Sequence, residues 1–182
     1  MTNYRRALII IDMQKGMQSA TLPRRNNPNA EAKIQQLLAH WRSASLPVVH
    51  VRHMSRSPGS VFWPGQVGAD FQDALAPLAS EHVLEKNVTD AFSNSGLERW
   101  LHVRGIKELV IVGVSTNNSV EATARSAGCL GFQTSVVSDA TFTFDAPDLN
   151  GTIRAAEDIH LMSLSNLNGE YARVIEASEL LG

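Results

Sequence analysis

The stretch ALIIID, residues 7–12, places an unbroken apolar run directly before an aspartate. An apolar run without polar alternation is typical of a strand covered on both faces, so this one predicts a central strand of a parallel sheet. Further short strand-forming runs follow along the chain, at residues 47–51, 82–86, 108–112, 133–137 and 173–175. We therefore expect Asp12 at the carboxyl end of the first of several strands.

Segments of helical periodicity separate these runs. After Asn29, which suits the N-cap position, Ile34, Leu37, Leu38 and Trp41 form one apolar stripe. Three later helices are expected, at about residues 97–104, 118–130 and 151–167, of which the first two end at Gly105 and Gly131. Repeated strand–helix–strand order predicts a three-layer α/β/α fold with a doubly wound, mostly parallel sheet, in one domain of residues 1–182.

The composition excludes several function classes. The 182 residues are 43% hydrophobic and 19% charged, with a formal net charge of -2. The densest basic clusters, Arg5-Arg6 and Arg24-Arg25, are too small for a nucleic-acid footprint. No apolar stretch approaches the roughly 18 residues of a membrane span, and residues 7–11 are too short for a signal peptide. We expect a cytoplasmic protein that binds neither nucleic acid nor membranes.

Three polar features follow predicted strands. Asp12 follows the first strand, Lys86 ends the third, and residues 113–119 follow the fourth. In doubly wound sheets, ligands bind outside the carboxyl ends of the strands. We therefore expect these features to meet at one edge of the sheet, with the Asp12 carboxylate within direct or water-bridged hydrogen-bond range of the Lys86 ammonium.

These features resemble those of the isochorismatase-like hydrolases. The matching stretches are ALIIIDMQ (7–14), VLEKNVTDAF (83–92), GVSTNNSVEATARSAGCLGFQTSVVSDAT (113–141) and HLMSLSNLNGEYARV (160–174). The resemblance implies a six-stranded sheet, a small-molecule substrate, no organic cofactor, and a homo-oligomer, either a dimer or a tetramer.

The resemblance also implies catalytic residues, with one departure. Amidases of this family have an Asp, Lys and Cys triad, to which Asp12 and Lys86 match, whereas Ser119 occupies the cysteine position. Cys129, the only cysteine, lies about ten residues or nearly three helical turns farther on, and we expect it to be a small buried apolar residue.

Ser119 has two alternative roles. A serine hydroxyl is a much weaker acid than a thiol, and an aspartate paired with a lysine is a poor base for activating it. Isochorismatases proper lack the cysteine, and there the aspartic acid protonates an enol ether before water attacks. We therefore expect Ser119 to position water or substrate, with a serine-dependent amidase as the alternative.

The turn GVSTNNS, residues 113–119, suits an anion. Unpaired amides at the start of the following helix point toward a negative charge. The resemblance implies a cis peptide between Val114 and Ser115 and an oxyanion site formed by the amides of Ser115 and Ser119. Thr116 and Asn118 are assigned to substrate or anion binding, to helix capping, or to both.

Other residues are candidates for the substrate pocket. Gln14 lies in the first matching stretch, and Trp63 lies with Phe62 in the Pro- and Gly-rich loop of residues 54–70, where they either cover a substrate or bury the loop. Phe142 and Phe144 follow the fifth strand.

We expect no catalytic metal. His50 and His53 on or after the second strand lack the carboxylate that accompanies such histidines in metal-binding nicotinamidase-like relatives. The sequence thus predicts an isochorismatase-like hydrolase acting on an enol ether or an amide. The alternatives are the amidase with Ser119 as nucleophile and a non-catalytic small-molecule-binding protein on the same fold.

Overall fold

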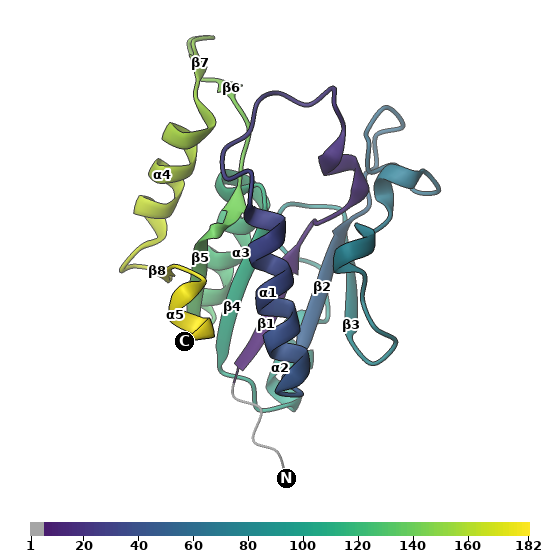
Figure 1. Ribbon diagram of the computed structural model, residues 1–182, viewed down its shortest axis with the longest axis vertical. Helices are drawn as coiled ribbons and strands as arrows, with labels where there is room; N and C mark the ends of the chain where they lie inside the picture. Colours follow the sequence, from purple (N-terminus) through teal and green to yellow (C-terminus); the bar gives the residue numbers. More distant parts are fainter. Residues whose placement is uncertain (1–5) are drawn as a thin grey trace.

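A computed structural model describes residues 6–182. Its main sheet has six parallel strands in the order β3-β2-β1-β4-β5-β8 (Figure 1). In chain order they are β1 (Arg6–Ile11), β2 (Val48–His53), β3 (His82–Lys86), β4 (Glu108–Val114), β5 (Gln133–Phe142) and β8 (Arg173–Ile175). The predicted doubly wound, six-stranded sheet is confirmed.

Helices cover both faces of this sheet (Figure 1). Apolar side chains of α1 (Ala30–Ser43) and α5 (Ser178–Leu181) pack on one face. The other face packs against α2 (Leu97–Val103), the π-helical turn Thr116–Val120 with α3 (Glu121–Cys129), and α4 (Ala156–Leu167). The structure therefore has the predicted three α/β/α layers.

The structure of β1 explains why residues 7–11 are all apolar. Leu8 and Ile10 point to the α1 side of the sheet, whereas Ile9 and Ile11 point to the α2 and α3 side. All four side chains are at most 2% exposed. Both faces of β1 are therefore buried, which excludes polar alternation until the strand ends at Asp12.

Gly113 allows β4 to lie close beside β1. Its φ is +120°, and a Cβ at this position would stand 2.1 Å from the carbonyl oxygen of Ile11. Only glycine fits this conformation and this distance. Gly113 thus permits the approach of the two strands whose ends carry Asp12 and Ser115.

Three local predictions are wrong. The helix predicted from about residue 151 begins at Ala156, because residues 153–154 form β7 (Ile153–Arg154), which pairs with β6 (Ala146–Pro147). Asn29 stands at the N-cap of α1, but its side chain makes no capping hydrogen bond. The fifth strand runs to Phe142 instead of ending near residue 137, because a register shift lets it continue beside β4.

Cys129 is exposed, not buried as predicted. It is the last residue of α3, whose buried positions are Thr123, Ala124 and Ala127. Cys129 thus lies off the buried face of the helix.

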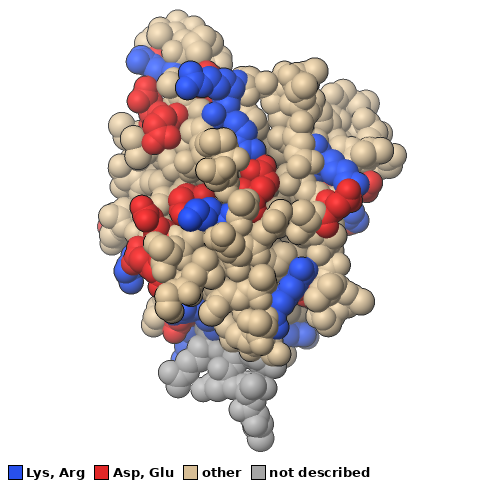
Figure 2. Space-filling model, viewed as in Figure 1, with Lys and Arg blue, Asp and Glu red and all other residues tan. Residues whose placement is uncertain are grey.

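The charged surface is mixed. On the face drawn in Figure 2, Lys and Arg side chains lie next to Asp and Glu side chains. Ion pairs such as Arg25–Glu31 and Arg154–Asp148 neutralise charge locally. None of the helices within residues 6–182 is both long and apolar enough to cross a membrane.

Candidate active site

Four neighbouring strands bring polar groups to the carboxyl edge of the sheet. Asp12 follows β1 with a φ of +52°, and Lys86 is the last residue of β3. Both are buried, at 3% and 4% exposure. The Lys86 Nζ donates to Asp12 Oδ2 over 2.7 Å. The predicted approach of these two side chains is confirmed.

Lys86 also contacts two other polar groups. Its Nζ lies 3.2 Å from Ser119 Oγ and 3.4 Å from His53 Nδ1. A lysine ammonium has three N–H donors, and Asp12, Ser119 and His53 provide three acceptors for them. In this arrangement the Ser119 oxygen accepts a hydrogen bond from Lys86.

The second oxygen of Asp12 is unsatisfied. Within residues 6–182, Oδ1 is buried and has no hydrogen-bond partner. Burial raises the pKa of the Asp12 carboxyl, although the charge and hydrogen bond of Lys86 and the nearby Ser119 hydroxyl oppose the shift. The site therefore holds a carboxyl group with a raised pKa and one oxygen available to a ligand.

His53 is the residue that the sequence analysis assigned only to a rejected metal site. It ends β2, and the parallel register places it directly beside Lys86. Burial lowers the pKa of His53, and the neighbouring Lys86 charge lowers it further. Its ring centroid lies 5.8 Å from that of Phe62. The sequence did contain a signal for His53. It stands at the carboxyl end of a predicted strand, as Lys86 does.

The turn after β4 carries the rest of the site. The peptide between Val114 and Ser115 is cis, as predicted. The Ser115 carbonyl accepts the amides of Asn118 and Val120, which closes the π-helical turn. Ser119 is buried, whereas Asn118 is exposed. Such π-helical turns occur frequently at functional sites.

Gln14 connects two segments next to the site through hydrogen bonds of its side chain. Its side chain is fully buried, and its Nε2 donates to the carbonyl oxygens of His53 and Ala69 at 2.9 Å each. Its Oε1 accepts the His53 amide at 2.7 Å. Both donor hydrogens of Gln14 are therefore used to tie the end of β2 to the loop of residues 54–70.

The structure does not bring the predicted aromatic residues into contact with Lys86. Phe142 is fully buried in the core on the α1 side, with the Arg25 guanidinium 3.3 Å from its ring centroid. Trp63 is partly buried, and its amide donates to the Ser60 carbonyl within the loop. Phe62, not Trp63, is the loop residue that lies against His53.

The next question is whether side chains that could bind a metal ion lie close together. Within the part of the chain that the structure describes, no three His, Cys, Asp or Glu side chains are grouped closely enough to hold a metal ion. At the candidate site, Asp12 already accepts from Lys86, and His53 faces the same ammonium.

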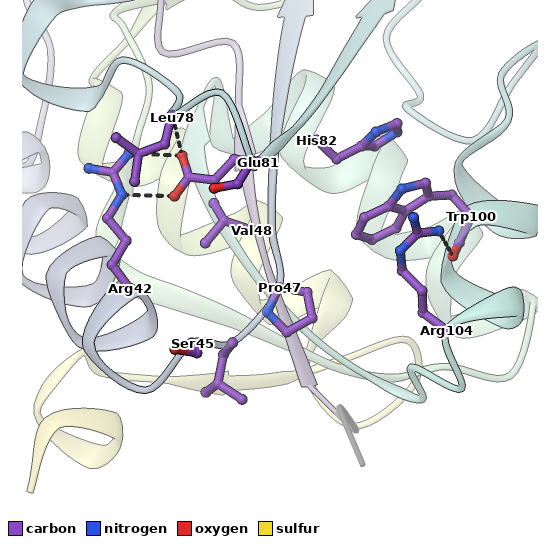
Figure 3. A pocket seen from close by; sticks show the side chains of 11 residues that line it. Arg42, Ser45, Pro47, Val48, Leu78, Glu81, His82, Trp100 and Arg104 are labelled. Carbon is purple, nitrogen blue, oxygen red and sulfur yellow. Dashed lines mark hydrogen bonds and ion pairs between the residues drawn. The ribbon is translucent and has the colours of Figure 1, made fainter. Parts of the chain in front are cut away.

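A separate pocket of about 420 Å³ lies at the opposite end of the strands, where β2 and β3 begin (Figure 3). Arg42 and Glu81 form one wall, and Trp100 forms the other. The indole of Trp100 stacks on His82 at 4.5 Å and on the guanidinium of Arg104 at 4.2 Å. These side chains satisfy one another and lie away from the strand ends that carry Asp12 and Lys86.

Several known proteins are similar to this chain in sequence and in fold. The isochorismatase domain model matches residues 6–179. The isochorismatase family protein YrdC of Bacillus subtilis is 35% identical over 177 residues, 97% of this chain and 95% of that protein. Nicotinamidase 3 of Arabidopsis thaliana is 30% identical over 187 residues, 96% of this chain and 86% of that protein. A solved structure of an isochorismatase-family protein from Chromobacterium violaceum is 43% identical, with a TM-score of 0.95 over 100% of this chain and 94% of that one.

Proposed function

The chain belongs to the isochorismatase family of hydrolases, and from that membership we propose an active centre made of Asp12, Lys86 and the turn of residues 115–119. The protein is a hydrolase that acts on a small molecule. In the proposed mechanism, Asp12 is the acid–base group and Lys86 its electrostatic partner. Ser119, in the position of the family's cysteine, binds substrate or water without forming a covalent bond.

The Asp12 carboxyl group is the observation that carries this proposal. One of its oxygens is held by Lys86 at 2.7 Å, and the other is buried without a partner among the described residues. A buried polar atom without a partner is unfavourable unless a ligand completes it. Burial raises the pKa of the Asp12 carboxyl, which favours the protonated form that a general acid needs.

For an enol ether, the proposed chemistry needs only these groups. Asp12 donates its proton to the enol carbon, and the oxygen lone pair stabilises the resulting cation. Water then adds to the cationic carbon, and the hemiketal collapses with loss of the alcohol. Asp12 ends the cycle protonated again, because the attacking water gives up a proton. Lys86 stabilises the carboxylate that exists between these steps.

For an amide, the same centre works differently. The amides of Ser115 and Ser119 at the turn would stabilise the oxyanion of a tetrahedral intermediate. Asp12 would take a proton from the attacking water and pass it to the leaving amine. The likeness to nicotinamidase 3, a relative named for an amide substrate, keeps this bond class within the proposal.

A covalent Ser119 intermediate is the alternative for amides. The Ser119 hydroxyl lies 3.2 Å from Lys86, a distance that suits stabilisation of an alkoxide. Activation also needs a base. The nearby carboxylate, Asp12, is paired with the Lys86 cation, which weakens it as a base. We therefore favour attack by water.

Specificity is proposed to lie around this centre. Thr116 and Asn118 flank the anion site in the turn, and Trp63 belongs to the loop of residues 54–70, which borders the site through Phe62. Gln14 holds the end of β2 and the loop of residues 54–70 beside the site. No organic cofactor and no metal enter the proposed reaction.

We further propose a single domain that works in the cytoplasm as a homo-oligomer, either a dimer or a tetramer. Large apolar side chains around β7 and α4 are exposed, among them Leu149, Ile153, Leu161 and Met162. We propose that this part of the surface is the interface between copies of the chain, because contiguous exposed apolar surface is typical of interfaces. Light scattering after gel filtration tests the assembly, and cell fractionation tests the location.

The proposal is tested with a panel of vinyl ethers and carboxamides incubated with the purified protein. We expect hydrolysis within one of these classes by the parent, and its loss in Asp12→Asn. Tight binding of a panel compound without turnover would instead support a non-catalytic binding protein. Mass spectrometry of the reacting enzyme addresses the covalent alternative, because an acyl adduct on Ser119 would show that serine is the nucleophile.

A further inference from the structure

Helix α4 reaches the turn of residues 115–119 with two buried polar side chains. His160 and Ser163 are three residues apart, so they project from the same face of the helix. They are 3% and 2% exposed. Both contact Thr116, which is fully buried in the turn that follows β4. Apolar packing in the core does not account for two buried polar side chains that both bind Thr116.

His160 contacts the side chain of Thr116. Its Nδ1 lies 2.8 Å from Thr116 Oγ1. Burial lowers the pKa of His160, while the Glu157 charge and a backbone hydrogen bond with Ser138 oppose this shift. A ring N–H that donates to a backbone carbonyl leaves the other ring nitrogen of a neutral histidine as an acceptor. We assign the neutral form in which Nδ1 accepts the Thr116 hydroxyl, which fixes the orientation of that side chain.

Ser163 contacts the main chain of the same residue. Its Oγ donates to the Thr116 carbonyl oxygen at 3.0 Å and lies 2.5 Å from Glu121 Oε2. Glu121 is the first residue of α3, so Ser163 connects α4 to both the turn and the helix that continues from it. Thr116 is therefore held through its side chain and its carbonyl by one helix.

The far side of the turn is held as well. Thr143, just beyond β5, donates to Asn117 Oδ1 at 2.6 Å. The turn is thus fixed between α4 and the end of β5. Held in this way, residues 115 and 119 keep a constant relation to Asp12 and Lys86.

We propose that His160 and Ser163 are positioning residues that hold Thr116 and thereby set the placement of the Ser115 and Ser119 amides at the catalytic centre. This inference rests on the proposed function of that turn. Neither side chain touches the reacting groups, so their effect on the reaction passes through the turn. A displacement of about 1 Å at a catalytic group can reduce a rate by roughly two orders of magnitude.

The kinetic test compares variants that keep or remove the contact. We expect His160→Leu and Thr116→Val each to lower kcat by roughly 10- to 100-fold, with KM changed less than about threefold, because positioning acts on the reacting state. The two changes combined should lower kcat no more than either one, since they break the same hydrogen bond. His160→Asn retains an acceptor near the Nδ1 position and should recover most of the rate.

Helix α4 provides a matched serine pair. Ser163→Ala removes the bond to Thr116, whereas Ser165→Ala removes only a bond from an exposed serine to the Leu161 carbonyl of its own helix. We expect Ser163→Ala to lower kcat and Ser165→Ala to leave it within about twofold of the parent. Equal effects of the two changes, or full activity of His160→Leu, would overturn the proposal.

The His160 contact has a second readout that does not depend on turnover. Nitrogen NMR of the histidine rings should show His160 as the neutral form with Nδ1 unprotonated, and Thr116→Val should shift that Nδ1 signal. A His160 with a protonated Nδ1, or no response to Thr116→Val, would contradict the contact. An inactive parent with the expected spectrum would count against the proposed function while supporting the contact itself.

Discussion

Two carboxylate–cation pairs lie at opposite ends of the sheet, and they differ in how completely their carboxylates are satisfied. At the carboxyl end, Asp12 meets Lys86 through one oxygen and leaves the other without a partner among the described residues. At the amino end, both oxygens of Glu81 accept hydrogen bonds from Arg42, and one of them also accepts from the Leu78 amide (Figure 3). That oxygen also lies 2.9 Å from His50 Nε2.

The pKa values of the Asp12 and Glu81 carboxyl groups are shifted in opposite directions. Burial alone would raise the pKa of Glu81, but its hydrogen bonds with Arg42, the Leu78 amide and His50 lower it to about 2. Burial raises the pKa of Asp12, and its contacts with Lys86 do not reverse that shift. Glu81, whose oxygens are both hydrogen-bonded, is therefore assigned to stabilising the fold. Asp12, which has one oxygen without a partner among the described residues, is assigned to binding a ligand or a proton.

The largest effect should come from Asp12→Asn, which keeps the shape of the side chain and removes its ability to carry a proton. We expect kcat/KM to fall by at least about 1,000-fold, or ~4 kcal/mol, because general acid–base catalysis is lost. Steady-state assays with the substrate found in the panel measure this change.

The same variant should lower the free energy of unfolding by less than Glu81→Gln does. Asp12→Asn removes the charge partner of the buried Lys86, but the raised pKa means that folding disfavours the charged form of Asp12, and a neutral amide relieves that part of the penalty. If Asp12→Asn retained activity and instead lost several kcal/mol of stability, Asp12–Lys86 would be a structural ion pair.

Glu81→Gln is the corresponding change at the other end of the sheet. We expect it to lower the free energy of unfolding by about 2 to 4 kcal/mol, because it leaves Arg42 without its charge partner. Activity should stay within about threefold of the parent. Urea unfolding and the same assay, run side by side with Asp12→Asn, show whether the two pairs separate stability from catalysis.

The pH dependence of stability should reflect the same pair. The folded-state pKa of Glu81, about 2, lies below its ordinary value of 4.5, so its contribution is complete above pH 4.5 and is lost as the pH falls toward 2. Glu81→Gln should lack this part of the acid-induced loss. A parallel pH curve for the parent and the variant would mean that Glu81 is not the group responsible.

Ser119→Ala should lower the reaction rate less than Asp12→Asn does. If Ser119 only orients water or substrate, losing its hydrogen bond should lower the rate by roughly one to two decades, or about 1 to 3 kcal/mol. Measurable turnover should therefore remain. A variant as inert as Asp12→Asn, together with a trapped acyl group on Ser119 in the parent, would establish the serine-dependent amidase instead.

The sequence predicts one of the two pairs and not the other. Asp12 and Lys86 stand at the ends of strands whose apolar runs are readable, and parallel strands bring their carboxyl ends to one edge. Arg42 and Glu81 come from the end of a helix and from the residue before β3. Their meeting depends on how α1 packs on the sheet, which no local pattern encodes.

Residues that support the site were also beyond the sequence analysis. His160 looks like one of several scattered histidines until α4 is placed against the turn, where its ring reaches Thr116. Phe142 was expected to follow the fifth strand and line a pocket, but that strand extends through Phe142, which lies in the core. The ends of β1 and β3 are readable from the sequence, whereas contacts between distant helices and turns follow from packing.

The most direct test is a carbon NMR titration of carboxyl groups in the parent, with Asp12→Asn and Glu81→Gln used to assign the two signals. The proposed centre predicts that Asp12 titrates above its ordinary value of 3.8 while Glu81 titrates near 2. The two curves would then lie on opposite sides of the ordinary range for carboxyl groups. An Asp12 that titrates below 3.8, as a fully satisfied ion pair would, contradicts its role as the proton-carrying group.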